Sequence, residues 1–436
     1  MPSRVSRSAS HPLLKVLAVR DFRLLWVGQL TSLLGSQFSL IALPWLVLQL
    51  THDPVALGVV LALSGVPRLL LMLVGGVIAD RFPPRAILLI ADLVSFILTG
   101  LLMALTLTGQ IQLWMVYALS LLFGLCGGFV MPAASAIVPA LLPSANLQTG
   151  NALTQGTNQL TSFLGPVLAG ATIAYFTPAH TPGGAGLLGL ALAFGIDAVS
   201  FAFSALMLAW MQSGRAVAPV EEAQKNVLEA IRTGVRYVWE TPVLRKLFGL
   251  LSLTNLAATG PLLVGIPVLA NQRLPGGAAA FGIIMSAYGG GNLVGIVLAG
   301  VLPRLKPVYM NLLVVGVLIS FGLGLGAFGW LTATWLGFLI MLLMGLGNGY
   351  LVIIIITQLQ RRTPPYMMGR VMSLFMFCVL SLTPLSQLIA GWISGFTLTG
   401  LFALAGGLML GVAAWIALDS QTRATLVEMV VVAETP

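Results

Sequence analysis

The sequence predicts an all-α polytopic membrane protein with twelve membrane-spanning helices arranged as two six-helix bundles. Apolar residues make up 58% of the 436-residue chain and charged residues only 8%, whereas about 25% of an ordinary soluble domain is charged. Apolar stretches of spanning length, roughly 17–25 residues, recur along the chain. The Lys and Arg residues gather in alternate gaps between these stretches. Such a chain is predicted to lie in a lipid bilayer.

The twelve predicted spans follow one another with short polar gaps. The first six occupy residues 24–50, 54–79, 86–108, 112–136, 150–176 and 187–211, and the second six occupy 247–270, 279–301, 308–329, 332–356, 371–395 and 398–418. They predict an N-terminal bundle over 23–211 and a C-terminal bundle over 247–418. The linker between them spans 212–246. Its apolar residues Leu228, Ile231, Val235 and Val238 recur at helical spacing, which predicts an amphipathic helix at the membrane surface.

The positive charges predict that both chain ends are cytoplasmic. If residues 1–22 lie in the cytoplasm, 19 of the 21 Lys and Arg residues fall in cytoplasmic segments or at the cytoplasmic ends of spans. Of the other two, Arg68 lies within a span and Arg273 lies on the opposite side of the membrane. This asymmetry follows the positive-inside rule. Residues 1–22 and 419–436 are therefore predicted cytoplasmic tails. The first ten residues are basic, but no short apolar core with a cleavage site follows, so a signal peptide is not expected.

Several classes of function are excluded by the same composition. The net charge of +9 is spread over loops and forms no basic face, so nucleic-acid binding is not expected. A membrane enzyme would need a cluster of His, Asp or Glu at a bilayer edge, and the sequence has none. The histidines His11, His52 and His180 are isolated from one another, so no metal site is expected. The sequence contains no GxxxxGK[ST] segment, so an ATP-driven pump is not expected. Cys126 and Cys378 lie in spans, where a packing role is expected.

The polar gap between the second and third spans carries the most informative motif, residues 76–85 (GVIADRFPPR). It resembles the signature loop of the major facilitator superfamily, which joins the second and third helices. The matching residues are Gly76, Ile78, Ala79, Asp80, Arg81 and Arg85, while Pro83 and Pro84 replace a Gly-Arg pair. Further stretches resemble the drug, macrolide and siderophore exporters of that superfamily, including enterobactin and macrolide exporters: residues 22–36, 130–153, 196–208, 234–247 and 369–374.

This resemblance implies a fold and a mechanism. Two six-helix bundles would rock about a central cavity, with helices 1, 4, 7 and 10 lining it, helices 2, 5, 8 and 11 forming the gates, and the others supporting them. Export of a small molecule would be driven by protons, with no cofactor, by a multi-pass protein of the bacterial inner membrane that we expect to be monomeric. We further hypothesise that Asp80 latches onto the backbone at Gly369 and Arg370, where a helix N-terminus favours an anion.

Residues 165–170 (GPVLAG) resemble the Gly-Pro motif that antiporters of the superfamily carry on helix 5. Pro166 removes a backbone donor and bends the helix, while Gly165 and Gly170 permit close helix contact. Thr161 and Ala169 stand where the motif prefers glycine. The motif favours an antiporter, and with it efflux of drugs, over an importer. Import or lysophospholipid transport by the same fold remains the alternative.

Three ionisable residues lie inside predicted spans: Arg68, Asp92 and Asp197. A charge in the bilayer is a functional hypothesis by default, so an aspartate could carry the coupling proton. A structural role, in which each charge braces its bundle through an internal partner, is favoured for Asp92 and Asp197 because the third and sixth helices are expected to be supports. Both readings stay open for Arg68, which lies on an expected gate helix. Related exporters hold an acid in helix 1 where this chain has Ser36, and the span 112–136 has no charge. Proton coupling is thus implied by the resemblance alone.

Polar and aromatic residues mark candidate positions for the cavity wall. Such side chains either line a transport pathway or join neighbouring helices. An interhelical hydrogen bond of the second kind stabilises a membrane protein by only about 0.6 kcal/mol. The candidates are Gln29, Ser32 and Ser36 on span 1, Gln155, Asn158, Gln159 and Ser162 on span 5, and Asn255, Asn348 and Gln387 in the second half, with the aromatic residues Trp45, Tyr117, Phe123, Tyr350 and Phe375. A mainly apolar, aromatic wall suits an amphipathic organic substrate.

Overall fold

The computed structural model describes residues 12–176, 187–213, 236–302, 307–363 and 368–419. Twelve helical segments of this part are long and apolar enough to cross a membrane, so the all-α prediction with twelve spans is confirmed. The first six spans are α2 (Arg20–Thr51), α3 (Pro54–Arg81), α4 (Pro84–Leu107), α5 (Leu113–Leu141), α6 (Leu147–Phe176) and α7 (Leu188–Trp210). Two short helices accompany them, α1 (Pro12–Ala18) and η1 (Ser144–Asn146).

The second six spans contain two interrupted helices. The elements are α9 (Pro242–Gly260), the π-helical turn η3 (Pro261–Gly265), α10 (Ile266–Arg273), α11 (Gly277–Val301), α12 (Pro307–Phe328), α13 (Thr334–Arg362), α14 (Met368–Ser381), α15 (Thr383–Phe396) and α16 (Leu398–Leu418). The predicted spans 247–270 and 371–395 are each a broken helix, because Pro261 and Pro384 remove backbone donors at the breaks. Most of the predicted linker helix lies outside the described residues; residues 236–240 are helical.

The polar motif between the second and third spans is mostly helical rather than a turn. Helix α3 continues through Arg81, and only Phe82 and Pro83 separate it from α4. Pro83 adopts φ −56° and ψ 125°, outside the helical region, and Pro84 occupies the first turn of α4. Proline is well suited to that position because the first helical N–H groups have no partner within the helix. The sequence prediction therefore placed the end of this helix too early.

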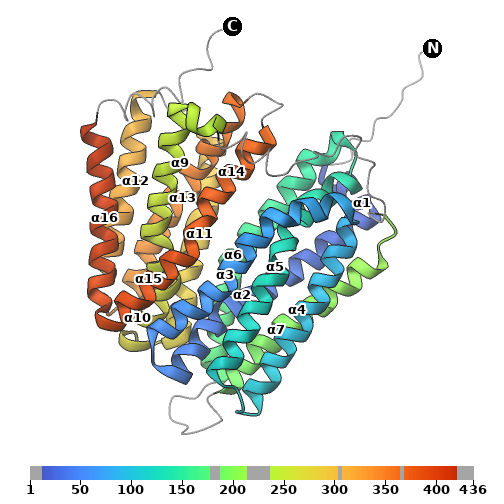
Figure 1. Cartoon of the computed structure of the whole chain (residues 1–436), viewed down its shortest axis with the longest axis horizontal. Helices are drawn as coiled ribbons and strands as arrows, with labels where there is room; N and C mark the ends of the chain where they lie inside the picture. The colour runs from blue at the N-terminus through green and yellow to red at the C-terminus, as the bar shows by residue number, and fades with distance from the viewer. Residues whose placement is uncertain (1–11, 177–186, 214–235, 303–306, 364–367, 420–436) are drawn as a thin grey trace, which may run out of the picture.

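Figure 1 shows two bundles, α2–α7 and α9–α16, that separate toward the end where both chain termini lie and converge toward the other end. We call these the terminal end and the convergent end. Between the bundles, α6 packs against α11 and α3 packs against α15. The main contacts between the bundles are therefore made by the second, fifth, eighth and eleventh spans, the set that the resemblance implies as gates.

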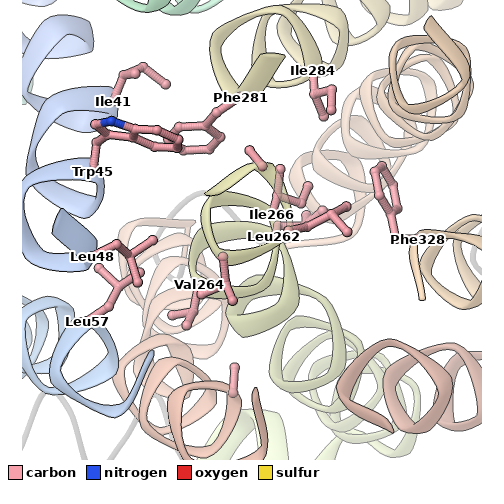
Figure 2. Packing of buried hydrophobic residues seen from close by; sticks show 14 of the residues in the cluster. Ile41, Trp45, Leu48, Leu57, Leu262, Val264, Ile266, Phe281, Ile284 and Phe328 are labelled. Carbon is pink, nitrogen blue, oxygen red and sulfur yellow. The ribbon is translucent and has the colours of Figure 1, made fainter. Parts of the chain in front are cut away.

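The largest apolar core joins the two bundles at the convergent end. Trp45, Leu48 and Leu57 enter it from the first bundle, and Val264 and Phe281 enter it from the second. Figure 2 shows Trp45 pointing toward Phe281, and Leu48 and Leu57 lying near Val264. Helix association inside a bilayer depends on such close packing because lipid is as apolar as the side chains. This core holds the convergent end shut.

Candidate functional site

The contact between α6 and α11 depends on residues without large side chains. A Cβ on Gly170 of α6 would lie 2.6 Å from the carbonyl oxygen of Ala278. A Cβ on Gly282 of α11 would meet the carbonyl oxygen of Pro166 and lie 3.1 Å from Cα of Gly170. Ser286 also donates a hydrogen bond to the Phe163 carbonyl. The GPVLAG segment thus lies where the two bundles touch.

The contact between α3 and α15 has the same character. A Cβ on Gly58 would lie 2.7 Å from the carbonyl oxygen of Gln387, and one on Gly65 would lie 2.8 Å from Cγ of Pro384. Gln387 is only 5% exposed, and its Oε1 has no hydrogen-bond partner among the described residues. A buried acceptor without a partner is costly. Gln387 is therefore a polar group enclosed between the gate helices.

The contact between α6 and α11 ends about halfway along the helices. On α11, Gly289 and Gly300 share a face because they are about three helical turns apart. A Cβ on Gly289 would meet the carbonyl oxygen of Ser162, whereas one on Gly300 would meet nothing within 4 Å. On α6, Gln155 is exposed on the face that carries Pro166 three turns further on. The bundles are therefore closed at the convergent end and apart at the terminal end.

The predicted cavity residues lie in several different surroundings. Asn255 donates to the Leu251 carbonyl at 2.9 Å, within its own helix. Asn348 donates to Oδ1 of Asn292 at 3.2 Å, which joins α13 to α11. Gln29 is half-buried with Oε1 unpartnered in the described part of the chain. The remaining polar and aromatic candidates are half-buried: Ser32, Ser36, Tyr117, Phe123, Asn158 and Gln159.

Three of the predicted aromatic residues are packed away in this conformation. Trp45 is enclosed between the bundles, 3.2 Å from the place of a Cβ on Gly277, whose φ of +50° favours glycine. Phe375 packs in a core of the second bundle with Phe248, at 6.3 Å between ring centroids. Tyr350 is 8% exposed. The sequence could not reveal this, because an aromatic residue in a span has the same pattern whether it faces a cavity or a neighbouring helix.

A family model described as Major Facilitator Superfamily matches residues 25–383, most of the chain. The chain belongs to the Major Facilitator Superfamily. Members of this superfamily are transporters rather than enzymes, and twelve apolar helices make this chain a multi-pass membrane protein. Among the described residues, no three His, Cys, Asp or Glu side chains gather in a way that could hold a metal ion.

Curated relatives and solved structures agree with this assignment. An uncharacterised MFS-type transporter y4rN of Sinorhizobium fredii is 28% identical over 88% of this chain and 91% of its own length. The enterobactin exporter EntS of Citrobacter koseri is 26% identical over 81% of this chain and 80% of its own. The solved structure of a mutant of the nucleoside transporter NupG shares the fold with a TM-score of 0.72 at 14% identity, over 91% of this chain and 99% of its own.

In this superfamily member, the motif residue Arg85 ties α4 to the end of α7. Its Nε donates to the Leu208 carbonyl at 2.6 Å and its Nη2 to the Ala209 carbonyl at 2.7 Å. Asp21 of α2 accepts the next backbone N–H groups, from Gln212 at 3.2 Å and Ser213 at 2.6 Å. The start of the predicted linker is thus fixed to the first bundle. Sequence reasoning missed Asp21, whose only signal is its place in the first turn of a span.

The structure describes only the backbone of five predicted gating residues: Gly76, Asp80, Arg81, Gly369 and Arg370. The backbone places the first three on the last turns of α3 and the last two on the first turn of α14, which begins at Met368. The N-terminus of α14 is therefore where the latch hypothesis needs it. The hydrogen bond itself stays a prediction.

Asp197 of this superfamily member is 2% exposed in α7 and faces α2. Its carboxylate accepts a hydrogen bond from Ser39 and lies within hydrogen-bonding reach of Ser36 and Ser200. A Cβ on Gly35 would be 3.1 Å from its Oδ1, so glycine lets the helices close on it. A carboxylate of α7 thus lies beside Ser36, where the resemblance implies an acid. In the sequence, the one indication that Asp197 has polar neighbours is Ser200, one helical turn later.

Asp92 and Arg68 occupy different surroundings. Asp92 of α4 is half-buried and hydrogen-bonds to Ser204 of α7, within the first bundle. Arg68 of α3 is exposed and its guanidinium lies over Gly127 of α5. The three charges of the spans are not brought together into one site.

Proposed function

We propose that this protein exports a hydrophobic or amphipathic small molecule (a drug, macrolide or siderophore-like compound) by alternating access, in exchange for protons. One observation carries the proposal: among the described residues, the close contacts between the gate helices lie toward the convergent end and are made at glycines. A pathway closed at one end and open at the other is the arrangement that rigid-body rocking of two bundles needs. The relation to a named enterobactin exporter supports export and the substrate class.

The terminal end is the cytoplasmic end in this proposal. Its described residues include the basic side chains Arg20, Arg23, Arg85, Arg245 and Arg361, as the positive-inside rule requires. The conformation is then inward-open and ready to take substrate from the cytoplasm or the inner leaflet. Import, or transport of a lysophospholipid, by the same rocking motion is the second candidate, because the GPVLAG segment is only a partial match to the antiporter motif.

For proton coupling, the proposal assigns Asp197 as the first candidate and Asp92 as the second. Asp197 is enclosed between α2, a predicted cavity helix, and α7, and serine hydroxyls can hydrogen-bond to its carboxyl group in either protonation state. Protonation therefore leaves its partners satisfied, while it removes a charge from the contact between two helices.

The test begins with a screen of compound susceptibility in cells that lack their own efflux pumps. An exported compound is then followed in inverted membrane vesicles under an imposed pH gradient. We expect uptake that depends on an acidic lumen in the wild type and in Asp92→Asn, and uptake that no longer responds to the gradient in Asp197→Asn. Unchanged gradient dependence in both variants would remove both candidates. Accumulation only in right-side-out vesicles would favour the importer.

A further inference from the structure

Arg68 lies midway along α3, in the centre of a membrane span, and its side chain is exposed. Val66 and Leu70, two residues away on either side, are also exposed, at 43% and 59%, and form the apolar outer face of the helix. Successive helical residues are about 100° apart, since a turn contains 3.6 residues. Arg68 therefore points to the opposite side of α3 from these two residues, away from the lipid.

Leu57 shows what lies on that side. It precedes Arg68 by about three helical turns on the same face, and it is fully buried in the core between the two bundles (Figure 2). Arg68 thus faces the axis between the bundles, one turn beyond the contact of Gly65 with Pro384. Gly127 of α5 makes room for it: a Cβ there would be 2.9 Å from Nε of Arg68.

Among the described residues, no carboxylate neutralises Arg68. Within the described ranges its guanidinium makes no hydrogen bond or ion pair, and the titratable group that interacts with it is the thiol of Cys126. The carboxylates of Asp92 and Asp197 are engaged by serine hydroxyls. The predicted second bundle, residues 247–418, contains no Asp or Glu at all. An unpaired arginine at the centre of a span is energetically costly, so we expect an anion from outside the chain to neutralise it.

We propose that Arg68 binds the anionic group of the transported molecule, and that the substrates are amphipathic organic anions. This rests on the proposed function and adds the charge of the substrate. The planar guanidinium matches a carboxylate with two parallel hydrogen bonds, and Gly127, which has no side chain, leaves room for the guanidinium beside α5. Gln387, which faces Gly65 one turn away, offers an unpartnered Oε1 to a hydroxyl group of the same molecule.

The experiment compares two probes that differ in charge, 1-pyrenebutyrate and the neutral 1-pyrenebutyramide. Their binding to the purified full chain in lipid nanodiscs is measured by equilibrium dialysis, with empty nanodiscs subtracted. We expect the wild type to bind the butyrate at least tenfold more tightly than the amide. Arg68→Gln should lose this preference, and Arg68→Lys should keep part of it. Arg273→Gln is the matched control, because Arg273 donates to Gly329 and Thr399 at the convergent end.

Equal affinity of both probes for the wild type, no measurable binding of the butyrate, or a full preference in Arg68→Gln would each overturn the proposal. The proposed function is tested separately by vesicle transport. If the exported compounds are neutral or cationic, export stands and the anion site falls. If no compound is exported while the charge preference follows Arg68, the anion site stands and export falls.

Discussion

At the residue scale, the charged side chains of the first bundle divide into those that hold helices and those that face open space. Arg85 donates hydrogen bonds to backbone carbonyls at the end of α7, and Asp21 accepts one from a backbone N–H just beyond it. Asp197 is enclosed by serines. Arg68 alone among these four has no such partner in the described structure. In the proposal above, the same residue types therefore serve packing in one place and ligand binding in another.

Arg85→Ala should destabilise the protein without abolishing folding. It leaves the carbonyls of Leu208 and Ala209 without donors, and a hydrogen bond to a charged group contributes about 1.5–3 kcal/mol. We expect the midpoint of thermal unfolding in detergent to fall by several degrees. Arg20→Ala is the control, because its contact with the Trp210 carbonyl is long, at 3.5 Å. An equal fall in both variants would contradict the capping role of Arg85.

At the scale of elements, glycine sets where helices can meet. On α11 the glycines near the convergent end touch α6, and Gly300 near the terminal end touches nothing. Small residues let helix backbones approach inside a membrane, so the position of each glycine determines which part of a gate can close. The breaks after α9 and α14 similarly follow from Pro261 and Pro384.

Gly282→Ala should shift the protein away from the conformation described here. The added methyl group would meet the Pro166 carbonyl, and overpacking costs about 1–3 kcal/mol, which changes a conformational equilibrium about 5- to 150-fold. We expect residues at the convergent end to become more accessible to membrane-impermeant thiol reagents, and transport to slow. Gly316→Ala on α12, where a Cβ meets nothing within 4 Å, should change neither. Unaltered accessibility in Gly282→Ala would show that this contact is not a gate.

At the scale of the whole molecule, one apolar core links the bundles while two smaller cores stay within single bundles. The cores within a bundle keep it rigid. The shared core must open for the convergent end to open, because Trp45 and Phe281 meet across it (Figure 2). Rocking of two rigid bodies about the gate contacts is the motion that this division of cores permits.

A disulfide across the convergent end should block transport reversibly. A Cβ on Gly395 would lie 3.3 Å from Cγ2 of Val55, close to the geometry of a disulfide. In a background without Cys126 and Cys378, Val55→Cys with Gly395→Cys should stop transport when oxidised and recover it on reduction. Either single cysteine variant should transport normally.

The same locked protein should stay open at the terminal end. A third cysteine at Gln155, which is exposed in the half where the bundles are apart, should react with an impermeant maleimide in inverted vesicles while the disulfide is intact. Transport by the oxidised protein at the rate of the reduced protein would contradict alternating access at this contact.

The number and approximate bounds of the spans and the superfamily could be predicted from the sequence, because hydropathy, loop charge and the residue 76–85 motif are local properties. Which intramembrane groups face a partner could not. Asp197 meets Ser39, and Asn348 meets Asn292, only because distant helices pack together. Arg68 was visible as a charge, but its exposure toward the axis between the bundles depends on how α3 is rotated against α5 and α15. Glycine contacts between helices set that rotation, so it emerges only when the whole chain is packed.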